Sequence, residues 1–227
     1  MLNILFEDRD LIVVEKPVGV ESQSARALAP DMVSQIRTHL RRTTHSADSY
    51  VGVIHRLDKP VRGVMVYAKN KKSAAALSAQ LQNGQFHKFY SAVVIGAPDA
   101  PSGTFADYLA KDAKTNTAKF VDSDAPDAKP AKLSWTLQKT IVSPDFGTLS
   151  LLDVELFTGR FHQIRAQLSG HGLPILGDLR YGNISQETEK SRTGLSLCAR
   201  ELHFVHPTTK KEMIFSITPR HGAFAMF

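Results

Sequence analysis

The chain has 227 residues, of which 42% are hydrophobic and 22% are charged, and its formal net charge is +6. These proportions are typical of a globular protein and exclude a disordered chain. The single cysteine, Cys198, excludes an internal disulfide and a cysteine-based zinc site, so we expect a cytoplasmic protein. Glu7 and Asp8 interrupt any signal-peptide core, and no apolar run approaches the roughly 18 residues of a spanning helix, so we expect no membrane association.

The first part of the chain is predicted to alternate strands and helices. Two short apolar runs separated by Asp-Arg-Asp predict a β-hairpin over residues 2–7 and 11–15. Asp31 is a predicted N-cap, and the spacing of apolar residues after it predicts a helix as far as Arg42. Three further elements are expected: a buried strand at 64–68, an Ala-rich helix at 71–82 that Gly84 terminates, and a strand at 86–95.

The second part of the chain begins with a mixed segment, residues 99–131, which we interpret as rich in loops with a short strand near 117–121. The elements predicted after it are strands near 133–137 and at 148–156, a turn at 158–160, a helix at 161–170, and strands at 195–205 and 212–217. About eight to ten strands and three or four helices without regular βαβ alternation predict an α+β fold with a largely antiparallel sheet. No linker divides the chain, so we expect one domain, residues 1–227.

The positive charge is concentrated in residues 51–90. This segment holds seven basic residues and one acid, Asp58, whereas the rest of the chain is close to neutral. Such a field attracts a polyanion, for example RNA or DNA. The alternative is a solvated basic face without a partner.

Three residues are candidates for chemistry. Asp58, set among cations, should ionise easily near an anionic substrate, or it caps the turn before Pro60. A helix beginning at Phe161 places Arg165 on its apolar face, where the guanidinium needs an anion unless it extends to solvent. We choose Asp58 as that anion. Tyr90 lies in a predicted strand and is either a core side chain or a site residue.

Metal and cofactor sites are not expected. The histidines show no helical ligand spacing beside an acid, and His203 and His206 would point to opposite faces of a strand. No Gly-rich phosphate loop or dinucleotide-binding pattern occurs in the sequence. Cys198 is most simply a small buried side chain.

The motif His55-Arg-Leu-Asp58, followed by Gly63 and an apolar strand ending at Lys69, resembles the signature of the RluA family of RNA pseudouridine synthases. Other family motifs occur in the same order, and the resemblance extends from about residue 2 to residue 219. They are Glu15-Lys-Pro-x-Gly19, Lys88-Phe-Tyr90-Ser-Ala, Thr158-Gly-Arg-x-His-Gln-Ile-Arg165, Gly172-x-Pro-Ile-x-Gly-Asp178-x-x-Tyr181-Gly182 and Leu202-x-Phe-x-His206-Pro.

The resemblance implies a mixed, mostly antiparallel central sheet with flanking helices and an active-site cleft across it. It implies that Asp58 is the catalytic aspartate, that Tyr90 is an active-site tyrosine, and that Arg165 pairs with Asp58. The implied substrate is ribosomal or transfer RNA, without cofactor or metal, and we expect a monomer with no obligate protein partner. Arg56 would replace the flipped base, and the residues expected to contact RNA are His55, Arg56, Lys59, Arg62, Arg160 and His162.

Two departures from the family pattern bear on these expectations. The family usually has Thr-Ser before Gly63, whereas this chain has Val61-Arg62, so local RNA contacts should differ. Many relatives carry an N-terminal RNA-binding module, and we expect none here because the first catalytic-domain strand begins at residue 2. Two other functions stay open: a non-catalytic RNA-binding protein, and a glycosidase-like hydrolase, which would need a second carboxylate as general acid.

Overall fold

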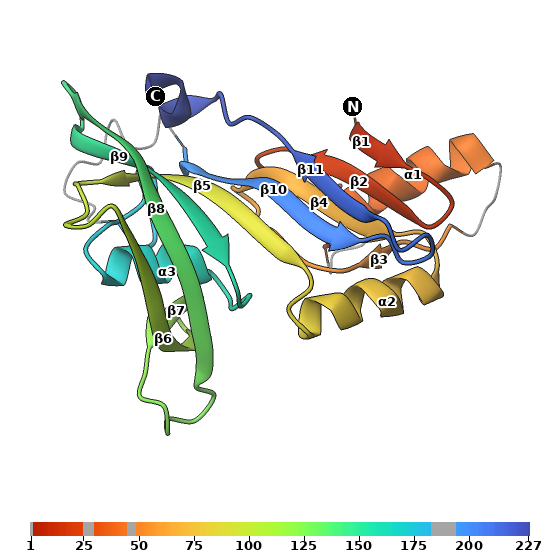
Figure 1. Ribbon diagram of the computed structural model, residues 1–227, viewed down its shortest axis with the longest axis horizontal. Coiled ribbons are helices and arrows are strands. Elements are labelled where there is room, and N and C mark those ends of the chain that lie inside the picture. Colours follow the sequence, from red (N-terminus) through yellow and green to blue (C-terminus); the bar gives the residue numbers. More distant parts are fainter. Residues whose placement is uncertain (1, 25–29, 45–48, 183–193) are drawn as a thin grey trace. The chain divides into compact units, whose positions relative to one another are not determined.

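The structure is a computed structural model that describes residues 2–24, 30–44, 49–182 and 194–227 (Figure 1). It divides into two compact units, residues 1–88 with 199–218 and residues 89–198 with 219–227. The described residues form eleven strands, three α-helices and a short 3₁₀-helix, somewhat more strands than predicted. The mostly antiparallel α+β class is confirmed, while the single domain stays a prediction. In the described ranges, each helix is too short or too polar to cross a bilayer.

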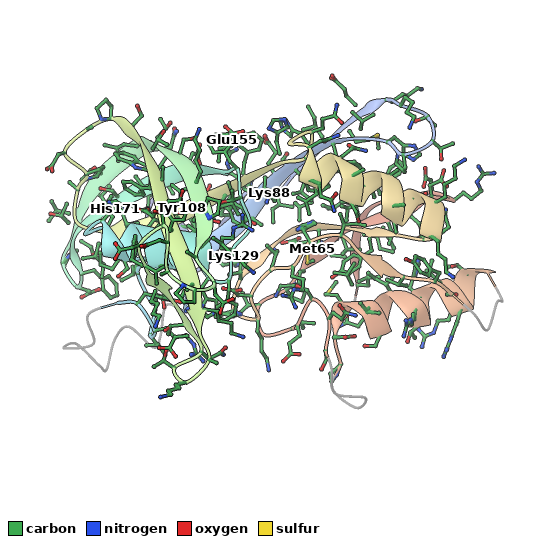
Figure 2. All side chains as sticks on the ribbon, turned by 90° about the horizontal axis from the view of Figure 1, so that it is seen from below. Met65, Lys88, Tyr108, Lys129, Glu155 and His171 are labelled. Atoms are coloured by element: carbon green, nitrogen blue, oxygen red, sulfur yellow. The ribbon has the colours of Figure 1, made fainter. Side chains whose placement is uncertain are left out.

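The first unit is a set of strands with two helices, and its pairs β1/β2, β2/β4, β3/β4 and β10/β11 are antiparallel. Its strands run in the order β1, β2, β4, β10 and β11, with β3 also paired to β4. Their bounds are β1 Asn3–Glu7, β2 Leu11–Lys16, β3 Gly52–Val53, β4 Arg62–Ala68, β10 Leu197–Val205 and β11 Glu212–Ser216, and β10 starts two residues before this unit. Helices α1 (Met32–Thr44) and α2 (Lys71–Gln82) lie on opposite faces of these strands (Figures 1 and 2).

The core of the first unit follows the period-2 pattern of its strands. One face presents Leu11, Val13, Val64 and Val66, which pack with Leu77 of α2. Both helices begin at a side-chain cap: Asp31 accepts a hydrogen bond from the Ser34 amide at 2.7 Å, and Asn70, for which no cap was predicted, accepts one from the Ser73 amide at 2.8 Å. The predicted N-cap at Asp31 is confirmed.

The second unit is a longer antiparallel sheet packed against one helix. Its strands run in the order β5, β9, β8, β6 and β7. Their bounds are β5 His87–Ile95, β6 Ser102–Asp112, β7 Thr117–Phe120, β8 Lys129–Ser143 and β9 Gly147–Leu156. Helix α3 (Gln163–Gly170) covers one face of β6, β7 and β8, where Ala166 packs with Leu109, Ala118 and Ala131. A 3₁₀-helix, Gly222–Met226, places Ala223 in a separate cluster with Val93 and Leu149.

The expectation of a loop-rich segment over 99–131 is wrong for much of its length. Residues 102–112 form β6, and β8 begins at Lys129. β6 contains Phe105, Tyr108 and Leu109, but its apolar and polar residues do not alternate regularly, so the sequence pattern does not indicate a strand. Pairing with β8, from Ser102 opposite Thr136 to Leu109 opposite Lys129, supplies the hydrogen bonds that hold it extended. The short strand expected near 117–121 is confirmed as β7.

Helix α3 begins at Gln163 and not at Phe161 as predicted. His162 precedes it with a φ of 50°, a left-handed conformation that cannot continue a right-handed helix toward Phe161. The Gln163 side chain accepts hydrogen bonds from the Thr158 hydroxyl at 2.8 Å and the Arg160 amide at 3.0 Å, which ties the preceding turn to the helix. Phe161 therefore does not share a helical face with Arg165.

Candidate active site

Asp58 lies in the first unit, on a loop whose backbone is held by buried hydrogen bonds. Its carbonyl accepts from the Val61 amide at 3.0 Å, which closes the turn that contains Pro60. One residue earlier, the buried Ser22 hydroxyl donates to the Leu57 carbonyl at 2.8 Å and accepts from the Leu57 amide at 2.9 Å. The carboxylate itself is partly exposed. A reactive group is thereby carried on a rigid backbone.

Lys16, the last residue of β2, is a buried cation that contacts the Asp58 loop. Its ammonium donates to the carbonyls of Pro17 at 3.0 Å, Val20 at 2.7 Å and Lys59 at 3.2 Å, so it ties the turn after β2 to the residue that follows Asp58. Burial lowers the pKa of Lys16 to about 8, and the charge of Asp58 opposes that shift. The family motif Glu15-Lys-Pro-x-Gly19 contains this lysine, but nothing in a single sequence indicates that its ammonium reaches Lys59.

Three of the seven basic residues in segment 51–90 form ion pairs with acids from the beginning of the chain. Arg62 forms an ion pair with Glu15, Lys69 with Glu7 at 2.7 Å, and Lys59 a loose one with Glu21 at 3.9 Å. The two residues that depart from the family pattern, Val61 and Arg62, both contact the protein itself: Val61 is buried in the core, and Arg62 forms a hydrogen bond with Glu15. Arg56 is exposed.

His55 lies inside the first unit. It is 9% exposed, its ring packs on Phe86 at 5.4 Å between centroids, and Nε2 accepts from the Val66 amide at 3.4 Å. Burial, reinforced by the charge of Lys88, lowers the pKa of His55 to about 3, so the ring is neutral. A neutral buried ring argues against the direct RNA contact expected for His55.

Arg165 lies in the second unit and is buried. A buried guanidinium needs an anion as its partner, as the sequence analysis expected. The anion that the structure brings to it is Asp178: Nε donates to Oδ2 at 2.7 Å and a terminal nitrogen donates to Oδ1 at 2.8 Å. Asp178 is fixed in turn by the amides of Arg180 at 2.9 Å and Tyr181 at 3.2 Å. Sequence reasoning quoted Asp178 within a motif but gave it no role.

Tyr181 and His162 complete this cluster. The guanidinium of Arg165 lies 5.2 Å from the centre of the Tyr181 ring. The Tyr181 hydroxyl accepts from the Ala118 amide at 2.6 Å and is also hydrogen-bonded to Nδ1 of His162 at 3.0 Å. The motif at 172–182 thus folds back over α3 and fixes both Arg165 and the left-handed turn before the helix.

The predicted catalytic residues are divided between the two units. Asp58 belongs to the first, and Tyr90 and Arg165 belong to the second. Tyr90 is a buried residue of β5 and is paired in register with Val154 of β9. The Asp58–Arg165 pair and the cleft across the sheet therefore stay predictions.

The sequence analysis did not predict one cluster of two aspartates and a histidine. Asp8, Asp10 and His206 bring ligand-type atoms within 4.8 Å of one another. Nδ1 of His206 accepts from the amides of Thr208 at 3.2 Å and Thr209 at 3.0 Å, so Nε2 carries the proton that it donates to Asp8 at 2.8 Å. This hydrogen-bond pattern ties the turn between β1 and β2 to the turn after β10 and makes the cluster a structural junction.

The fold is that of pseudouridine synthase catalytic domains. The solved human protein RNA Pseudouridylate Synthase Domain Containing 4 matches 99% of this chain and 91% of its own with a TM-score of 0.79 at 21% identity. Human RNA Pseudouridylate Synthase Domain Containing 1 matches 97% of this chain and 84% of its own with a TM-score of 0.77 at 22% identity.

The sequence comparisons identify the family as well as the fold. Residues 10–170 match the family described as RNA pseudouridylate synthase. An uncharacterized RNA pseudouridine synthase of Aquifex aeolicus is 32% identical over 95% of this chain and 69% of its own length. The dual-specificity RNA pseudouridine synthase RluA of Vibrio vulnificus is 33% identical over 90% of this chain and 78% of its own. The chain belongs to the RNA pseudouridine synthase family and is an isomerase that acts on RNA.

Proposed function

We propose that the protein converts uridine to pseudouridine at defined positions of a structured ribosomal or transfer RNA, with Asp58 as the catalytic carboxylate. The observation that carries the proposal is the Asp58 loop: a partly exposed carboxylate on a backbone clamped by Lys16 and Ser22. A catalytic group must be held close to its productive geometry by its surroundings, and this loop supplies that support. The cytoplasm is the proposed place of action, and no cofactor or obligate protein partner enters the proposal.

The reaction breaks the N1–C1′ bond of uridine, turns the base and forms the C5–C1′ bond; C5 then loses its proton and N1 takes one up, so that the product is an isomer of uridine. Asp58 attacks C1′ or removes a proton from C2′, and in either case its carboxylate must be ionised. Arg165 is proposed to keep that carboxylate charged and aimed while Asp178 holds the guanidinium. Tyr90 is proposed to stack on the uracil.

The target uridine must leave its stack before it reacts, which costs a few kcal/mol. Arg56, an exposed residue of the Asp58 loop, is proposed to fill the space that the base leaves. Lys59, Arg62, Arg160 and His162 are proposed to contact the RNA, Arg62 in competition with Glu15. For His55 we now propose a positioning role, because its ring is buried beneath the loop.

Replacing Asp58 by asparagine tests the proposal. We expect Asp58→Asn to bind RNA with the parent's affinity and to lose all detectable isomerisation, since the shape is kept and only the charge is removed. Release of tritium from RNA labelled at uracil C5 measures the reaction, and it also separates an isomerase from a non-catalytic RNA-binding protein and from a hydrolase.

The matched control is Asp99→Asn, which removes an exposed loop carboxylate and should leave the rate unchanged. Turnover by purified Asp58→Asn above about one part in a thousand of the parent rate would overturn the assignment. Mapping pseudouridines in cells with and without the gene then identifies the RNA and the uridines.

A further inference from the structure

A pocket of about 320 Å³ lies in the second unit, between the strands β6 to β8 and the turn that leads into α3. Its apolar part is formed by side chains such as Leu109 and Ala118, and its charged part by Lys111, Lys129 and Arg160. Lys129, at the start of β8, is labelled in Figure 2. Of these residues, only Arg160 was expected from the sequence to contact RNA.

The two lysines face the pocket because of strand register. Lys111 is paired with Ala118 on β7, and Lys129 is paired with Leu109 on β6. Ala118 and Leu109 both pack against Ala166 of α3, so their partners point to the same face of the sheet. Lys111 and Lys129 are both exposed, so an anion can reach them from solvent.

Two cations of the pocket, Lys111 and Arg160, are held by contacts that do not neutralise them. The ammonium of Lys111 lies 4.6 Å from the centre of the Phe161 ring, and Nε of Arg160 donates to the Pro130 carbonyl at 2.8 Å. No carboxylate of the described ranges forms an ion pair with Lys111, Lys129 or Arg160. The lining includes one acid, Asp127, against three cations.

We propose that this pocket binds a phosphodiester of the substrate RNA, with Lys111, Lys129 and Arg160 as its charged ligands. Three cations that lack carboxylate partners, in a pocket with apolar walls, match an anion that brings its own charge and an apolar sugar. The pocket deepens the proposed function, on which it rests for the identity of the polyanion. It makes β6 to β8 a part of the RNA-binding surface that family motifs in the sequence do not include.

The experiment compares salt dependence of RNA binding among four variants. The probe is a fluorescein-labelled oligouridylate, titrated at several salt concentrations. For Lys111→Gln with Lys129→Gln, the slope of log K against log salt should fall by about one, which weakens binding about tenfold near 0.1 M salt. Asp127→Asn should bind more tightly than the parent, and asparagine suits the φ of 63° at this position.

The matched control is Lys119→Gln. Lys119 is exposed on β7 next to Ala118, so its side chain points to the opposite face, and its removal should change the slope much less. A double variant that keeps the parent slope, or a Lys119→Gln that loses as much, would refute the pocket. Asp58→Asn should keep the parent slope while losing conversion, so turnover by Asp58→Asn would overturn the proposed function and leave the pocket standing.

Discussion

The pair formed by Arg165 and Asp178 illustrates how one buried charge determines its surroundings. The guanidinium and the carboxylate are 6% and 0% exposed at their side chains, so neither can be compensated by water. Removing one partner of such a pair typically costs about 3–5 kcal/mol. We therefore expect Asp178→Asn to lower the free energy of unfolding by that amount, as measured by urea denaturation.

The control is the double variant Arg165→Met with Asp178→Leu, which replaces both charges by apolar side chains. It should recover much of the lost stability without any activity, because the uncompensated charge is gone and the proposed aiming of Asp58 is gone with it. A double variant less stable than Asp178→Asn would contradict the assignment of the pair as a mutually dependent unit.

His55 gives the protein a defined acid sensitivity. Its pKa is about 3 in the folded chain and about 6.5 in the unfolded chain, so between these values only the unfolded chain binds the proton. Stability is therefore complete above pH ~6.5 and falls as the pH drops toward 3. Relative to His55→Leu, the parent should lose up to about 1.4 kcal/mol per pH unit in this range.

Urea unfolding of the parent and of His55→Leu at pH 7, ~6 and ~5 measures this difference. The variant also loses the contact with the Val66 amide, but that loss is the same at every pH. Parallel stability curves for the two proteins would show that the imidazole can be protonated inside the fold.

Among the elements, those with an apolar period were predicted well and those held by pairing were not. Helices α1 and α2 carry their own capping and spacing signals, and the structure agrees with both. Strand β6 has no regular apolar alternation, and its extended conformation depends on pairing with residues of β8 that lie 20 to 34 positions further along the chain. The start of α3 was wrong because a left-handed φ at His162 leaves no signal in hydrophobic periodicity.

Gly63 shows why a motif requires glycine at the junction of β4 and β10. Its φ is 156°, and a Cβ added there would collide with the side chain and carbonyl of Ala199. Gly63→Ala should therefore cost about 2–3 kcal/mol through overpacking between two central strands. Urea denaturation at neutral pH measures the loss.

Gly84→Ala is the matched control for this substitution. Gly84 also has a positive φ, 78°, but nothing lies within 4 Å of the added Cβ, so only backbone strain of about 1 kcal/mol is expected. Equal losses for the two variants would mean that β4 and β10 can move apart to accept the methyl group.

At the scale of the whole molecule, counting charges along the sequence overestimated the positive field of residues 51–90. Residues 51–90 are strongly positive in sequence, yet Glu7, Glu15 and Glu21 of the preceding segment pair with three of the cations. The acids and the cations lie far apart along the chain, and only the pairing of β2 with β4 brings Glu15 opposite Val64 and beside Arg62. The pocket at Lys111 and Lys129 was invisible for the same reason, because its cations are scattered among acids in the sequence.

The family motifs predicted the candidate catalytic residues of the site but not the residues that support them. The motifs named Asp58, Tyr90 and Arg165, and the burial of Arg165 agrees with its need for an anion. They could not supply Asp178 as its partner or Lys16 as the clamp of the Asp58 loop. Both depend on side chains that reach across turns, for which a single sequence contains no periodic signal.

The first unit is assembled from the two sides of an insertion, residues 1–88 and 199–218. Gln80 exchanges two hydrogen bonds with Val205, and Asp8 accepts one from His206. During synthesis on the ribosome, β1, β2 and β4 therefore emerge long before β10, and the apolar edge of β4 stays without its neighbour while residues 89–198 are added. Unpaired edges of this kind template aggregation, so we expect the nascent chain to be most prone to aggregation until residue 205 has left the exit tunnel.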